Sequence, residues 1–370
     1  MVSGKRTYRI AILGTRGIPA RYGGFETFAE ELAVRLVQRG HEVTVYCEKG
    51  ASCSADANYK GVRLEYISAP PLGPLDVVWF DICCMAKATR HYDLLYLLGY
   101  GAGSFTWMPR LLGKPVWINM DGLEWKRSKW PWYARLYLRL NEWCAAKFAS
   151  LMIADAEGIK RYLKESYGES SAVAMIPYGA ELISVPPDPS YLTQMGVSPG
   201  SYYLVVCRLE PENHVREIIE GFNLAATRRE LIVVGDIDTD TPYVRDLKRS
   251  AGSKVRFIGT CYEKPMLKAL RYYAFAYFHG HSVGGTNPSL LEAMGCANVV
   301  IAHDNPFNRE VAAECARYFA SPVEITEIIN SLESGTDLGK MHAVAQERIR
   351  TIYSWERITD LYEELFRGFL

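Results

Sequence analysis

The chain has 370 residues, a length at which two domains are the natural expectation. Its 42 basic and 42 acidic side chains cancel, so composition gives no argument for a nucleic-acid partner. The nine cysteines form no CxxC pair, which is typical of reduced thiols in the cytosol and unlike a disulfide framework or a zinc site. No run approaches the roughly 20 apolar residues of a membrane-spanning helix, and the first apolar run is too short for a secretory signal. We therefore expect a cytosolic protein, with surface contact to a membrane left open.

The first half alternates apolar strands with helical segments. A run at 8–13 leads into a glycine-rich loop, and a helix with Phe28, Leu32 and Leu36 on one face follows. This order predicts a parallel sheet covered by helices, in one doubly wound α/β domain over residues 1–177. The predicted strands are 8–13, 41–47, 62–67, 93–98, 116–120, 151–154 and 172–176.

Residues 178–201 are rich in Pro, Ser and Gly and show no period, so we interpret them as a linker. A second α/β alternation follows over residues 202–353, and residues 354–370 are predicted to form a C-terminal helix. The predicted strands of this half are 202–207, 231–234, 255–258, 274–278 and 299–302. Two parallel-sheet domains facing each other would leave a cleft at the carboxyl ends of their strands.

The segment 280–295, GHSVGGTNPSLLEAMG, connects a predicted strand to a helix. Asn287 can cap that helix and Pro288 suits its first turn, so the free N–H groups there favour an anion. Glu292 would lie on the same side and could accept hydrogen bonds from a ribose. An ordinary strand-to-helix connection has the same pattern.

The loop 14–26, GTRGIPARYGGFE, follows the first strand. Its glycines allow a close approach of the backbone to a ligand, and its arginines supply positive charge. The spacing differs from the GxGxxG of dinucleotide-binding proteins, which disfavours a nicotinamide dehydrogenase. A purely structural glycine turn is the alternative. The residues are Gly14, Gly17, Gly23 and Gly24, with Arg16 and Arg21.

Two charged residues follow predicted strands directly. Arg208 could hold a phosphate bidentately, or form a surface ion pair with Glu210 or Glu212. Asp121 could orient or deprotonate a hydroxyl, or be a turn residue before glycine.

Asp236, Asp238 and Asp240 raise the question of a metal site. The calcium-loop pattern fails, because Thr241 and Leu247 stand where glycine and glutamate are needed. A paired-aspartate site that holds Mg²⁺ against a nucleotide diphosphate is the alternative, but Asp236 follows a strand and a glycine like an ordinary loop residue, so we expect no metal here.

The segment 125–148 has four tryptophans and two tyrosines among basic residues and leucines. Such a composition is typical of a helix that docks on a membrane surface, and equally of a half-buried helix packed on its own domain. Single-stranded nucleic acid is a third alternative that the zero net charge disfavours.

Taken together, GTRGIPARYGGFE, the Arg208 segment and HSVGGTNPSLLEAMG resemble the retaining glycosyltransferases of family 4, which have the GT-B fold. The resemblance covers essentially the whole chain. It is closest to the bacterial rhamnosyltransferases that build polysaccharide repeat units on a lipid diphosphate.

The resemblance implies sugar transfer from a nucleotide diphosphate, without a required metal or cofactor, between two Rossmann-like domains. It also implies that the C-terminal helix crosses back to the first domain. Asp121 and Arg208 are then the catalytic candidates. The implied donor-binding residues are Gly17, Arg21, Gly23, Gly24, Asn213, Gly284, Gly285, Thr286, Asn287, Pro288, Ser289 and Glu292.

This chain departs from the family pattern at three positions. Gly284 stands where the first glutamate of the E-x7-E element is expected, and Asn213 replaces a lysine. His214, Arg16 or Arg21 are candidate substitutes for that lysine. Asp121 stands where many relatives carry a histidine.

We therefore expect a transferase that moves L-rhamnose from dTDP-rhamnose to a lipid-diphosphate-linked sugar, at the inner face of the cell membrane. A UDP- or GDP-sugar donor, a sugar-nucleotide epimerase, and a non-catalytic nucleotide-sugar-binding scaffold are the alternatives.

Overall fold

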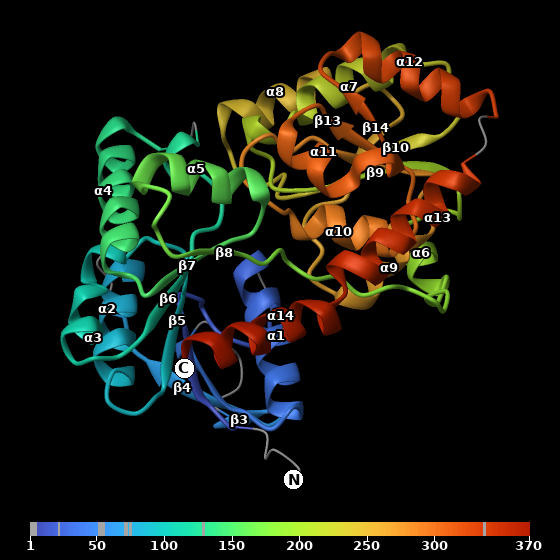
Figure 1. Cartoon of the computed structure of the whole chain (residues 1–370). Helices are drawn as coiled ribbons and strands as arrows, with labels where there is room; N and C mark the ends of the chain where they lie inside the picture. The colour runs from blue at the N-terminus through green and yellow to red at the C-terminus, as the bar shows by residue number, and fades with distance from the viewer. Residues whose placement is uncertain are drawn as a thin grey trace. The chain divides into compact units, whose positions relative to one another are not determined.

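The computed structural model describes residues 6–20, 23–50, 56–69, 73, 76–127, 130–335 and 338–370. The chain divides into two compact units: unit 1 comprises Met1–Tyr178 and Trp355–Leu370, and unit 2 comprises Gly179–Ser354. Each is a sheet flanked by helices (Figure 1). The predicted α/β fold class, with two Rossmann-like parallel-sheet units, is confirmed.

The sheet of unit 1 has the strand order β3-β4-β2-β1-β5-β6-β7-β8. All neighbours pair in parallel except β3 and β4, which are antiparallel. Its strands are β1 (Arg9–Leu13), β2 (Glu42–Glu48), β3 (Asn58–Tyr59), β4 (Val62–Ile67), β5 (Leu94–Leu98), β6 (Val116–Asn119), β7 (Leu151–Ala154) and β8 (Val173–Met175). Its helices are α1 (Gly24–Gln38), α2 (Asp76–Ala88), α3 (Trp107–Leu111), α4 (Trp132–Phe148), α5 (Glu157–Tyr167) and α14 (Trp355–Phe369).

The sheet of unit 2 is parallel throughout, with the order β11-β10-β9-β12-β13-β14. Its strands are β9 (Tyr202–Val206), β10 (Glu230–Val234), β11 (Val255–Phe257), β12 (Ala276–His279), β13 (Val300–His303) and β14 (Ala316–Phe319). Its helices are α6 (Ser190–Gln194), α7 (Val215–Leu224), α8 (Pro242–Ser250), α9 (Lys264–Tyr272), α10 (Pro288–Gly295), α11 (Pro306–Ala312), α12 (Pro322–Glu333) and α13 (Gly339–Arg348).

The central strands are apolar along their whole length because helices cover both faces of each sheet. Successive residues of β9 show this directly. Tyr203 and Val205 pack in one core cluster of unit 2, while Tyr202 and Leu204 pack in the other. This alternation is the period of two that a strand imposes on its side chains.

The structure corrects three details of the sequence prediction. The short strands β3 and β14 were not predicted, since neither contains an uninterrupted apolar run. Strand β12 begins at Ala276 because the Ala274 amide still closes the turn after α9, donating to the Arg271 carbonyl. Residues 178–201 include helix α6, whose Leu192 is buried in the core of unit 2, so this segment is more than a connection.

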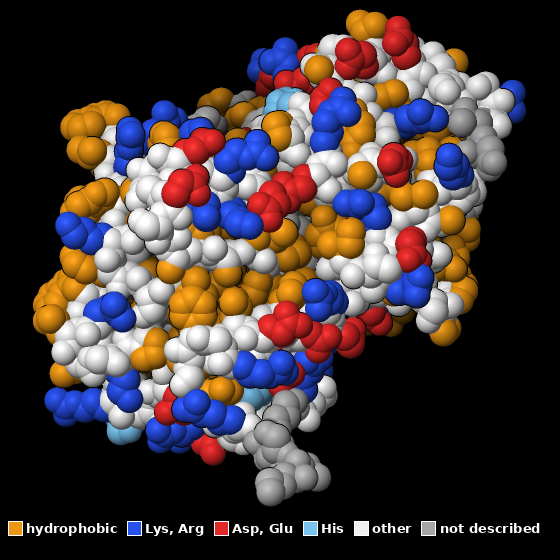
Figure 2. Space-filling model, viewed as in Figure 1, with side chains coloured by type: hydrophobic (Ala, Val, Ile, Leu, Met, Phe, Trp, Pro, Cys, Tyr) orange, Lys and Arg blue, Asp and Glu red, His pale blue; other side chains and the backbone are white. Residues whose placement is uncertain are grey.

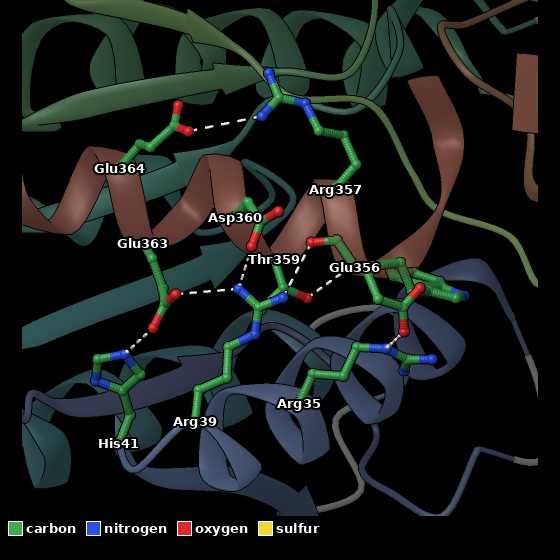
Figure 3. Close-up of polar contacts among 10 residues, drawn as sticks. Arg35, Arg39, His41, Glu356, Arg357, Thr359, Asp360, Glu363 and Glu364 are labelled. Carbon is green, nitrogen blue, oxygen red and sulfur yellow. Dashed lines mark hydrogen bonds and ion pairs between the residues drawn. The ribbon is translucent and has the colours of Figure 1, made fainter. Parts of the chain in front are cut away.

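Helix α14 packs on α1 within unit 1, and its acidic side chains contact Arg39 and His41, which lie between α1 and β2 (Figure 3). The Arg39 guanidinium donates to Asp360 at 2.5 Å and to Glu363 at 3.0 Å, and His41 Nε2 lies 3.0 Å from Glu363. Beneath these polar contacts, Tyr362 is buried and its hydroxyl lies 2.6 Å from that of Tyr96 in β5. The last helix is thus an integral part of unit 1.

Among the described residues, no helix combines the length and the apolar character needed to cross a bilayer.

Candidate functional site

The stretch between β12 and α10 forms the predicted strand, turn and capped helix. Asn287 accepts a hydrogen bond from the Ser289 amide at 2.9 Å, and Pro288 occupies the first helical position. Gly280 is required at the end of β12, because a Cβ there would lie 1.9 Å from the Asn213 carbonyl oxygen. The first turn of α10 therefore presents amide groups at the carboxyl edge of the sheet, a position suited to an anion.

Glu292 lies on α10 and is held by an arginine that the sequence interpretation missed. Arg271, at the end of α9, is buried, and its Nη2 lies 2.7 Å from Glu292 Oε2. Burial acts to lower the pKa of this guanidinium, but the Glu292 carboxylate and nearby groups outweigh it and raise the pKa overall. Glu292 itself keeps 40% of its side chain exposed, so its carboxylate is fixed and still accessible.

Ser289 joins the same network. Its hydroxyl lies 2.7 Å from the Tyr277 hydroxyl, accepts from Arg271 at 3.1 Å, and lies 3.2 Å from the Val206 carbonyl at the end of β9. These contacts tie α10 to β9 and β12. The structure therefore places Ser289 as a residue that positions the helix, whereas Gly284, Gly285 and Thr286 lie in the preceding turn.

Arg208 follows β9, the strand that pairs with β12, so it lies at the same edge of the sheet as the first residues of α10. Half of its side chain is exposed, and its Nη1 is 3.8 Å from Glu210 Oε1. That pair is long and solvated, so it competes weakly with an anionic ligand. The predicted ion pair to Glu210 exists, and it leaves the guanidinium accessible.

Asn213 is buried and connects the two loops of this edge. Its Nδ2 donates to the Arg208 carbonyl at 2.7 Å, and its Oδ1 lies 2.9 Å from His281 Nδ1. The side chain therefore fixes the backbone that carries Arg208. A lysine at this position would need to leave that buried arrangement.

Two of the histidines near this edge, His279 and His303, have lowered pKa values. Burial lowers the pKa of His279 well below its ordinary value, and burial together with His214 lowers the pKa of His303 to about 4. His214 Nδ1 lies 2.9 Å from the Gly280 carbonyl, and its ring stacks on His303 with centroids 4.1 Å apart. Arg208 and Arg271 supply positive charge at this edge.

In unit 1, the loop after β1 is held by Glu26. Gly14 is required because a Cβ there would meet the Leu98 carbonyl oxygen at 2.3 Å. Glu26 Oε1 accepts from the Arg16 amide at 3.1 Å and from the Thr15 hydroxyl at 3.3 Å. Burial raises the pKa of Glu26 against the lowering effect of these hydrogen bonds.

The other predicted residues of this loop are spread along it. Gly17 packs on Cys47, Gly23 precedes α1 and Gly24 begins it. Arg16 is exposed and 4.0 Å from Glu48. Arg21 lies outside the described residues.

Asp121 follows β6 in the left-handed region, with φ of 47°. Its Oδ1 accepts from the Tyr178 hydroxyl at 3.3 Å, and its amide donates to Asn119 at 2.9 Å. Burial and the neighbouring Glu124 raise the pKa of Asp121, while Arg127 acts in the opposite direction. A carboxyl in this setting is a candidate to hold or accept a proton.

The aspartates at 236–240 form a loop. Asp236 accepts from the Thr239 hydroxyl at 2.7 Å and from the Asp238 amide at 3.1 Å. Within the part of the chain that the structure describes, no group of three or more His, Cys, Asp or Glu is arranged to hold a metal ion.

Comparisons with known proteins match each half of the chain to a family model. Residues 198–351 match the family model described as Glycosyl transferases group 1, and residues 7–181 match a domain of unknown function, DUF1972. No curated protein matches the chain significantly.

Several solved structures share the fold over both units. Sucrose-phosphate synthase from Thermosynechococcus elongatus aligns with a TM-score of 0.82 at 16% identity, covering 98% of this chain and 99% of that one. HepE from Anabaena, in complex with UDP and glucose, aligns at 0.75 and 17%, covering 98% and 100%. The UDP-forming α,α-trehalose-phosphate synthase from Burkholderia vietnamiensis aligns at 0.72 and 12%, covering 98% and 100%. Residues 198–351 therefore resemble the Glycosyl transferases group 1 domain, and the chain as a whole has a two-unit GT-B fold.

Proposed function

We propose that the protein is a retaining glycosyltransferase that takes its sugar from a nucleoside diphosphate. The observation that carries this proposal is the edge of unit 2, where an accessible Arg208 and the capped start of α10 follow two adjacent strands. A diphosphate suits the cation and the helix amides, and a ribose suits the accessible carboxylate of Glu292.

In the proposed reaction, the bond between the anomeric carbon and the phosphate oxygen breaks while the acceptor oxygen bonds to the same face of that carbon. The acceptor proton passes to the departing phosphate oxygen. Arg208 and the amides of α10 stabilise the negative charge that develops on the diphosphate. Asp121 orients the acceptor hydroxyl. No step requires a metal ion or a cofactor.

The donor proposed is dTDP-L-rhamnose and the acceptor a lipid-diphosphate-linked sugar, both on the basis of the motif resemblance. The HepE structures contain UDP or UDP-glucose, which supports a nucleoside diphosphate in this fold and keeps UDP- and GDP-sugars as competing donors. Gly284 removes a carboxylate that the family motif places near the donor sugar, which is compatible with a 6-deoxy sugar.

Thermal shift with dTDP-, UDP-, GDP- and ADP-sugars tests the donor class. A donor at 100 times its Kd should stabilise the protein by about 2.7 kcal/mol, and Glu292→Ala should remove most of that shift. Incubation with the selected donor then separates the alternatives. Conversion without acceptor would indicate an epimerase, and binding without turnover on any acceptor would indicate a scaffold.

A further inference from the structure

Helix α4 presents two faces of different chemistry within unit 1. Its buried face is fixed by Glu142, whose carboxylate accepts from the Tyr162 hydroxyl at 2.7 Å, the Tyr167 hydroxyl at 2.6 Å and the Trp125 indole at 3.0 Å. The helix begins at Trp132, so Trp125 belongs to the packing beneath it. The half-buried packing that the sequence suggested as an alternative to membrane docking therefore applies to this face of α4 alone.

The opposite face carries large apolar side chains in one stripe, at helix positions i, i+4, i+8 and i+11. They are exposed to solvent: Trp132 by 77%, Leu136 by 63%, Leu140 by 54% and Trp143 by 47%. Residues at this spacing lie on one side of a helix. No core contact accounts for such a stripe, and a monomer rarely leaves one open without use.

The exposed charged side chains of α4 itself are all basic. Arg135, Arg139 and Lys147 are exposed, whereas Glu142, the one acidic residue of α4, is buried. The neighbouring α3 continues the pattern at its end with Arg110, Leu111 and Leu112, and Arg110 bonds Ser150 just beyond α4. Figure 2 shows hydrophobic and basic side chains interspersed along the margin where Figure 1 places these helices.

We propose that this face, defined by Trp132, Leu136, Leu140 and Trp143 with Arg135, Arg139 and Lys147, docks on the surface of a bilayer that contains anionic lipids. Indole and leucine side chains enter the boundary between headgroups and acyl chains, while the cations bind the headgroups. An apolar stripe flanked by cations alone complements an anionic lipid surface. Helix α4 has 17 residues and carries this stripe on one side only, so it would lie in the plane of the interface and not span the bilayer.

In the segment before α4, Lys126 and Arg127 contact neighbouring side chains of unit 1. The Lys126 ammonium lies over the rings of Trp125 and Tyr162, and Arg127 pairs with Glu124 at 3.1 Å. Residues 128–129 lie outside the described residues. The proposed contact uses the exposed cations of α4, of which Arg139 and Lys147 also lie over the Trp125 and Trp143 rings.

Vesicle flotation with the full chain tests the proposal, using phosphatidylcholine vesicles with and without phosphatidylglycerol. Binding should require the anionic lipid and weaken with salt. Trp132→Ser with Leu136→Ser should reduce binding by at least about tenfold, because both exposed side chains lose their apolar burial. Arg135→Gln and Lys147→Gln should each reduce it by roughly fivefold.

The matched control is Leu224→Ser with Val323→Ser in unit 2, which removes two equally exposed apolar side chains elsewhere. Equal binding to neutral and anionic vesicles, or equal loss in the control, would overturn the proposal. Light scattering tests the alternative that this face binds a second copy of the chain. Self-association that the α4 variants abolish would support that alternative and overturn the lipid proposal. Transfer to a water-soluble acceptor should stay normal in these variants, so loss of docking is separable from loss of catalysis.

Discussion

The carboxyl ends of β9 and β12 in unit 2 and those of β1 and β6 in unit 1 hold their polar groups differently. In unit 2, arginines supply the charge, Glu292 is locked to Arg271, and His279 and His303 are kept neutral. In unit 1, the groups are carboxyls, Glu26 and Asp121, whose pKa values burial raises. The groups of the first edge suit an anion, and those of the second suit a proton or a hydroxyl. This division predicts that unit 2 binds the donor diphosphate while unit 1 acts on the acceptor.

Arg208→Ala removes the accessible cation at the strand ends of unit 2 and should have the largest effect. We expect kcat/KM to fall by about 10²-fold to 10³-fold. Its side chain is half exposed and weakly paired, so the melting temperature should not change. Arg245→Ala is the matched control, because Arg245 is equally exposed and pairs with Asp240 at 2.7 Å. Steady-state kinetics measure both, and near-normal turnover in Arg208→Ala would refute the assignment.

Asp121→Asn tests the role of the carboxyl group that follows β6 in unit 1, and it should lower kcat by about 10²-fold. The acidic limb of the pH–rate profile should lie above 3.8, since the pKa of Asp121 is raised. A raised pKa contributes stability below 3.8 that is lost as pH rises through the folded value, so the asparagine variant should be the more stable one at neutral pH. Denaturation over a pH series measures this, and an unchanged rate would leave Asp121 a turn residue.

The Arg271–Glu292 pair separates positioning from ligand binding. Glu292→Gln should raise the donor KM by about tenfold, because a charged hydrogen bond to the ribose is weakened. The same substitution leaves the buried Arg271 without a carboxylate partner, which should lower the free energy of unfolding by about 1–3 kcal/mol. The loss stays moderate because Glu292 is partly exposed to solvent. Adding Arg271→Met should restore stability without restoring the donor KM. If both quantities recover together, Glu292 serves the fold alone.

The smallest effect is an opposite response of the two units to pH. Burial raises the pKa of Asp81 in α2 to about 8. The stability that protonated Asp81 contributes to unit 1 is therefore lost as pH rises from 3.8 toward 8. The lowered pKa values of His279 and His303 give stability to unit 2 that is lost as pH falls below 6.5. Between pH of about 7 and 5, unit 2 should lose on the order of 1 kcal/mol while unit 1 gains. Hydrogen exchange, corrected for intrinsic rates, resolves the units, and parallel changes would contradict the comparison.

Much of the fold could be predicted because strands buried on both faces are written as apolar runs. Leu94–Leu98 and Leu231–Val234 are examples, and their alternation with helical segments dictates a parallel sheet. β14 escaped prediction, since its ARYF sequence has no such run and its place beside β13 comes from pairing across the sheet.

The candidate site shows the same limit at the level of single residues. Asn287, Pro288 and Glu292 were predicted because capping and helix spacing are local. Arg271 gave no distinct signal, because α9 also carries Lys264 and Lys268, and its partner Glu292 is 21 positions away. Tyr178, which donates to Asp121 across 57 positions, gave none.

The sequence by itself determined the elements, the capped start of α10 and the composition of α4, because propensity, capping and periodicity act over a few residues. Only the tertiary structure decided which groups are locked, which are desolvated and which remain exposed. Burial set the raised pKa of Asp121, the fixed carboxylate of Glu292 and the open face of α4. Burial depends on neighbours that the chain brings together from far apart, and no local pattern records them.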